Sequence, residues 1–210
     1  MSPIEFSNEL KGWQTGIGAL LGFLALIVGA LWNFHLNRRR DAALRAEEAL
    51  SVAAALYGEI LLLRKEVGRL ARAVANVHVN GGTTRNPIVK FDEHFLEAHS
   101  LSEPLLYKAL APKIGLLSSD LILYITEFHQ KFQEARMSLP LLVDKPGRKY
   151  GYSVATVLVP ARDAVKNIQP ALKKIERMAS VSRPADDVDL GQTEDVIEME
   201  EEFLNTPSPP

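Results

Sequence analysis

The chain has 210 residues, of which 47% are hydrophobic and 24% are charged, and its formal net charge is −2. It contains no cysteine, which excludes a disulfide framework, a thiol nucleophile and a thiolate metal site. The charge is unevenly spread, because nine acidic residues against Arg183 alone give residues 180–210 a charge of −8 and leave +6 on the rest. A basic body suits an anionic membrane surface, whereas an acidic tail is repelled from it.

An apolar segment near the N-terminus predicts a transmembrane helix. The 23 residues between Lys11 and His35 carry no charge, and a hydrocarbon core of about 30 Å needs roughly 20 apolar helical residues. Trp13 and Trp32 stand near its two ends, as interfacial aromatic side chains do. We expect a short external N-terminus at 1–12 and a transmembrane helix at 13–34.

Three consecutive arginines, Arg38, Arg39 and Arg40, follow the apolar segment. By the positive-inside rule they place the N-terminus outside the membrane and the C-terminus in the cytoplasm. Near anionic lipid each guanidinium contributes about 1 kcal/mol of binding. The three arginines are therefore candidate headgroup ligands, and the lipid bilayer is the first predicted partner.

One face of the apolar segment carries small residues. They recur three and four positions apart, which places them on one side of a helix and lets a second helix approach closely. The candidate interface residues are Gly18, Gly22, Ala25 and Gly29. The alternative is that this face contacts lipid, because small residues are common in membrane helices.

A long helix is predicted at 41–78, where apolar residues alternate at spacings of four and three. With β-branched residues at position a and leucine at d, the pattern favours a parallel two-stranded coiled coil, in which Glu59 and Arg64 would pair between chains. Alternatively, Tyr57, Leu61 and Leu62 widen the apolar stripe, as in a helix at the centre of its own bundle. The candidate helix–helix contacts are Leu56, Ile60, Leu63, Val67, Leu70 and Val74.

Further helices are predicted at 91–99, 102–111, 119–137 and 153–178, and Pro160 and Pro170 should kink or divide the last of them. Strand patterns are nearly absent. The predicted fold is all-α, with a cytoplasmic domain at 35–179 in which three or four helices pack on the long helix. Residues 180–210 are predicted to be a disordered acidic tail. Apolar residues among its acids are candidate docking points for a protein partner: Val196, Ile197, Met199, Phe203 and Leu204.

Several short patterns resemble a group of proteins. Trp13-x-x-x-Ile17-Gly18-Ala19 opens the apolar segment, a basic run ends it at 37–41, and Tyr107, the sequence Lys-Ile-Gly-Leu-Leu at 113–117 and Phe128-His129 follow. Together they resemble uncharacterised single-pass α-helical membrane proteins of proteobacteria, over about residues 12–135. The resemblance implies a bacterial cytoplasmic (inner) membrane and this architecture, but no activity.

The densest group of potential metal ligands is His94, Glu97 and His99. His94 and Glu97 share a helix face, but His99 points elsewhere, so a metal-binding or enzymatic domain is the remotest hypothesis. We expect no cofactor, no enzymatic activity and, because the bases are not interleaved with aromatic residues, no nucleic-acid partner. The leading hypothesis is a membrane-anchored interaction or scaffold protein that forms homo-oligomers or binds another membrane protein. The alternative is a regulatory or sensing accessory subunit of a membrane complex.

Overall fold

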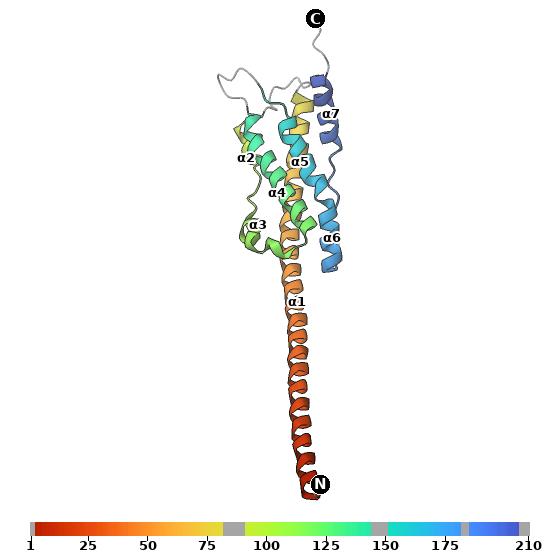
Figure 1. The fold of residues 1–210 in the computed structure, drawn as a ribbon. Coiled ribbons are helices and arrows are strands. Elements are labelled where there is room, and N and C mark those ends of the chain that lie inside the picture. Colours follow the sequence, from red (N-terminus) through yellow and green to blue (C-terminus); the bar gives the residue numbers. More distant parts are fainter. Residues whose placement is uncertain (1–2, 82–90, 144–150, 182–184, 206–210) are drawn as a thin grey trace. The chain divides into compact units, whose positions relative to one another are not determined.

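The computed structural model describes residues 3–81, 91–143, 151–181 and 185–205, and these contain helices but no strand (Figure 1). The all-α prediction is confirmed for this part of the chain. The chain divides into two compact units, Met1–Glu48 and Ala49–Pro210. We describe each unit by itself and call the second one the helical domain.

Helix α1 (Pro3–Gly81) supplies the whole described part of the first unit and continues into the helical domain. No proline occurs between Pro3 and Pro87, so nothing interrupts its backbone hydrogen bonds. Its described side chains between Gly16 and Leu36 are exposed. By length and composition α1 could cross a membrane, and none of its most apolar 18-residue window is buried.

The helical domain adds short helices to the second part of α1. Asp92 caps α2, since its Oδ1 accepts a hydrogen bond of 2.8 Å from the backbone N–H of Phe95. Pro160 is buried inside α5, whereas Pro170 lies in the first turn of α6 and separates these two helices. The elements are α2 (Glu93–Ala98), α3 (Leu105–Leu110), the 3₁₀-helix η1 (Ala111–Leu116), α4 (Ser119–Ser138), η2 (Leu139–Leu141), α5 (Ala155–Asn167), α6 (Gln169–Ala179) and α7 (Gly191–Asn205).

The core of the helical domain contains the side chains that the heptad pattern singled out. Leu56, Ile60, Leu63, Val67, Leu70 and Val74 are at most 3% exposed. They pack with the apolar faces of α4, α5 and α6 in a single cluster. Of the two alternatives for these residues, the contact within one chain is the one seen, because their surface is buried in the helical domain. The bundle alternative describes the domain, and the wide stripe has its expected physical meaning.

The C-terminal segment also differs from its prediction. Residues 191–205 form helix α7 instead of a disordered tail, and α7 packs against α5. Two of the predicted docking residues, Val196 and Ile197, are 0% and 2% exposed. Their apolar surface lies in the chain's own core, which offsets the cost of ordering a highly acidic helix.

Candidate functional site

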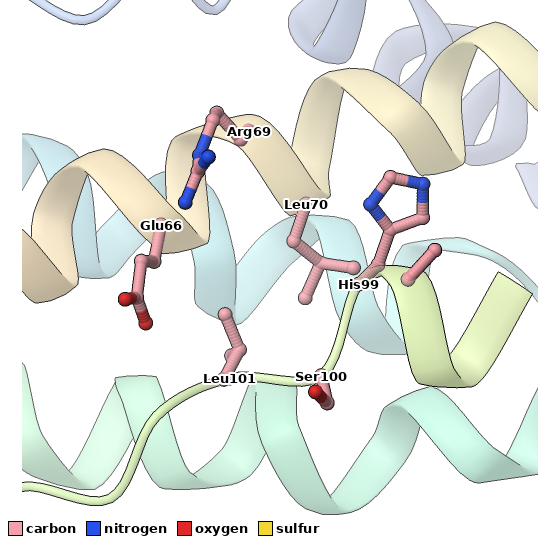
Figure 2. A pocket seen from close by; sticks show the side chains of 7 residues that line it. Glu66, Arg69, Leu70, His99, Ser100 and Leu101 are labelled. Carbon is pink, nitrogen blue, oxygen red and sulfur yellow. The ribbon is translucent and has the colours of Figure 1, made fainter.

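A pocket of mixed polar and apolar lining lies between α1 and the connection from α2 to α3 (Figure 2). It encloses about 200 Å³, and Leu70 and Leu101 form its buried apolar wall. The carboxylate of Glu66 accepts hydrogen bonds from the backbone N–H (3.1 Å) and the hydroxyl (2.9 Å) of Ser102. Glu66 therefore fixes the path of this connection.

His99 borders the same pocket, with its ring centroid 4.4 Å from that of Phe95. Partial burial, and then the positive charge of Arg69, lower the pKa of His99 below its ordinary value. The imidazole is therefore neutral near pH 7 and beside a guanidinium that disfavours its protonation. The described contacts of Glu66 go to Ser102 and not to His99.

Glu59 anchors helix α3 to α1. Its side chain is buried, and its two carboxylate oxygens accept hydrogen bonds from the backbone N–H groups of Leu106 (2.6 Å) and Tyr107 (2.8 Å). Helix α3 has no side-chain cap of its own at Pro104, so the carboxylate takes the place of one. The predicted interchain partner of Arg64 is thus committed to a contact within the chain.

His129 lies beneath this anchor, packed against Tyr107. Their rings stack at 3.8 Å with 24° between their planes, and the imidazole is 6% exposed. Neither ring nitrogen has a hydrogen-bond partner. Burial lowers the pKa of His129 to about 4, so the ring is neutral near pH 7.

Arg64 holds the segment 185–190, which forms no helix or strand and which we call the strap. The guanidinium is 3% exposed and donates hydrogen bonds to the backbone carbonyls of Val165 (3.1 Å) and Asp186 (2.7 Å). It also lies 4.0 Å from the carboxylate of Asp187, which is 97% exposed. Arg64 therefore binds both α5 and the strap, and these contacts within the chain take the place of the interchain pair with Glu59 that a dimer would allow.

Gly68 lets the strap approach α1 closely. A methyl group at this position would overlap Cγ1 of Val188 and lie 3.7 Å from its Cβ. Beside this contact a cavity of about 460 Å³ opens between the basic side chains of α1 and the acidic strap. Its charged lining comprises Arg64, Lys65, Arg72, Asp186, Asp187 and Asp189.

The strap and helix α7 cover a surface of α1 and α5, which we call the C-terminal groove. The groove buries Leu190, Val196 and Ile197, and polar contacts surround them. Lys166 pairs with Glu194, and His78 Nε2 lies 3.5 Å from a carboxylate oxygen of Glu200.

The remaining predicted tail residues lie outside this buried stripe. Met199 is 50% and Phe203 83% exposed. The side chain of Leu204 lies outside the described residues.

In the first unit, the predicted membrane residues keep their surfaces free. A methyl group placed on Gly18, Gly22 or Gly29 would meet nothing within 4 Å. Ala25 and the arginines Arg39 and Arg40 are exposed as well. The guanidinium of Arg38 lies 5.5 Å from the ring centroid of Phe34, at cation–π distance.

The sequence did not reveal the groups that organise the helical domain, namely Glu59, Arg64, Gly68 and the strap. Glu59 and Arg64 stand beside the heptad stripe in the sequence, but a charged residue at such a position is more often exposed than buried. Among the described residues no group of three His, Asp or Glu side chains could hold a metal ion. His94 is exposed, while His99 faces the pocket described above.

Comparisons of the chain with protein families, with curated proteins and with solved structures found no match. The resemblance to proteobacterial single-pass proteins stays a prediction. Function must be argued from the residues themselves.

Proposed function

We propose that this protein is a membrane-anchored, non-enzymatic interaction or scaffold protein that associates with copies of itself. Its first unit spans the bilayer of a bacterial inner membrane with the N-terminus outside. Its helical domain is cytoplasmic and presents surfaces to partners. The regulatory or sensing alternative stays a prediction.

The observation that carries this proposal is the exposure of the apolar part of α1. The large apolar side chains described from Trp13 to Leu36 are at least 40% exposed, so nothing within the first unit covers them. An exposed apolar surface of this length is costly in water and favourable in hydrocarbon. The arginines at 38–40 follow where a cytoplasmic headgroup layer would begin.

Self-association is assigned to the face of Gly18, Gly22, Ala25 and Gly29. In lipid, helices associate through close packing of small residues and not through the hydrophobic effect. The buried heptad residues 56–74 are unavailable for this purpose, since they pack inside the helical domain. The intermolecular contact must then lie elsewhere, and the membrane face is the surface whose chemistry suits it.

The test compares two glycine substitutions in one helix. Gly22→Ile places a branched side chain on the small-residue face, and the matched control Gly16→Ile places it on another side of the same helix, since a turn has 3.6 residues. Neither glycine has a neighbour within 4 Å of an added Cβ. Full-length protein is reconstituted in vesicles, and its dimer fraction is measured by crosslinking.

We expect Gly22→Ile to reduce the dimer fraction severalfold and Gly16→Ile to leave it unchanged. An equal response of the two variants would overturn the assignment of this face. Protease accessibility in sealed vesicles of known orientation tests the topology: digestion of the helical domain from the external side would refute the N-out arrangement.

A further inference from the structure

We propose that the C-terminal segment 185–205 is an exchangeable ligand, which occupies the C-terminal groove of its own chain and also that of a second copy. The proposal deepens the proposed self-association, because it requires two copies as neighbours in one membrane. It names a second contact between those copies, in the helical domain.

Charge complementarity is the first support. The segment 185–205 contains nine acidic residues and no basic one. The groove presents Arg64, Lys65 and Arg72 from α1 and Lys166 from α5. Exposed ion pairs contribute little to equilibrium stability, but opposite charges speed association and favour the correct partner. Opposite charges therefore suit a segment that must find the groove of a neighbouring copy.

The docked segment is also incompletely satisfied. Thr193 is fully buried, but its hydroxyl has no hydrogen-bond partner, and such a group costs about 1–3 kcal/mol. A cavity of about 460 Å³ also borders Val188 and the carboxylates of the strap. The buried hydroxyl lowers the stability of the docked state relative to a detached one, in which water can bond to it.

The second copy is the occupant that the groove chemistry favours. The segment 185–205 of this chain fits the groove, and every copy carries the same segment. Its residues Leu190, Val196 and Ile197 are buried, and Gly68 of α1 leaves room for Val188. Dimerisation through the membrane helices would raise the local concentration of the second segment into the range set by a short tether. Exchange then needs no new surface, only the reuse of an existing one.

The absence of native cysteine allows a direct test. Lys166→Cys is introduced into one full-length copy and Glu194→Cys into another, differently tagged copy, at two positions that pair across α5 and α7. The copies are co-reconstituted in vesicles and treated with a short thiol-specific crosslinker. The control replaces Lys166→Cys with Leu123→Cys, a position on α4 that is 70% exposed. A single chain with both cysteines at 166 and 194 calibrates docking within one molecule.

We expect a crosslinked dimer for the 166/194 combination and much less for 123/194. Adding Ile197→Asp to the Glu194→Cys copy should lower the yield severalfold. Val196→Ala, a milder change, should lower it less and guards against general misfolding. Equal yields for 123/194 and 166/194, or a yield indifferent to both α7 variants, would overturn exchange.

Two failures can be told apart. In the first case, the single-chain double variant crosslinks internally, and the parent chain is a dimer that Gly22→Ile weakens. If no 166/194 crosslink then joins two copies, exchange is refuted while the proposed function stands. If the copies are monomers and no crosslink joins them, both proposals fall.

Discussion

Replacing His129 with phenylalanine should remove a specific part of the pH dependence of stability. The variant keeps an aromatic ring stacked on Tyr107 but eliminates two buried nitrogens that lack partners. Burial lowers the pKa of His129 from 6.5 to about 4 in the folded state. Between these values the unfolded chain binds the proton more readily, so the free energy of unfolding falls as the pH falls.

The magnitude follows from the shift. Each pKa unit corresponds to about 1.4 kcal/mol. Protonation of His129 can therefore lower the free energy of unfolding by up to about 3 kcal/mol as the pH falls from about 6.5 through about 4. Its contribution is fully present above about pH 6.5. Carboxylates such as Asp120, whose pKa is lowered to about 2 mainly by its hydrogen bond from Lys174, titrate equally in both proteins and cancel in the difference.

Urea unfolding of the full-length protein in detergent micelles, followed by far-UV circular dichroism at a series of pH values, measures this difference. The gap between His129→Phe and the parent chain should widen as the solution is acidified. Parallel stability curves across this window would show that His129 is protonated, or solvated, in the folded protein and would refute the reasoning.

Three further substitutions test the packing of the helical domain by the same unfolding assay. Gly58→Ala, at an exposed position with no neighbour, should stabilise the helical domain by about 1 kcal/mol. Gly68→Ala places a methyl group against Val188 and should instead destabilise the domain by about 1–2 kcal/mol. Equal effects of the two substitutions would contradict the close approach of the strap to α1. Thr193→Val should stabilise by about 1 kcal/mol, because it removes an unpartnered hydroxyl at constant shape, and a loss would indicate a hidden partner. Glu59→Ala should cost about 3 kcal/mol by orphaning two N–H groups, and Glu59→Gln clearly less; indistinguishable variants would exclude the anchoring role.

The core-facing residues of α1 could be predicted because periodicity reports which face of a helix is apolar. Leu56, Ile60 and Leu63 are buried as the pattern requires. Periodicity does not report whose surface covers that face. A leucine at d looks the same against a second chain as against α4 and α5, so the dimer and the bundle could not be separated by the heptads alone.

Composition misled at the C-terminus. High negative charge predicts disorder when no partner supplies apolar contacts, but Val196 and Ile197 have such a partner in their own domain. Glu59 and Arg64 show the complementary limit. Their burial depends on backbone groups 47 and 101 residues away along the chain, and no local pattern encodes such distant hydrogen bonds.

Arg64 recognises the strap through a backbone oxygen, that of Asp186, whose own side chain is exposed. This hydrogen bond depends on the position of the main chain at Asp186 and hardly on the side chain there. Position 186 can therefore vary in sequence while the strap keeps its path, whereas Asp187 accepts a hydrogen bond of 3.0 Å from Nε2 of Gln169 and lies 4.0 Å from Arg64. Arg64 itself cannot drift, because the single ammonium of lysine does not offer the planar, divergent N–H groups that reach α5 and the strap together.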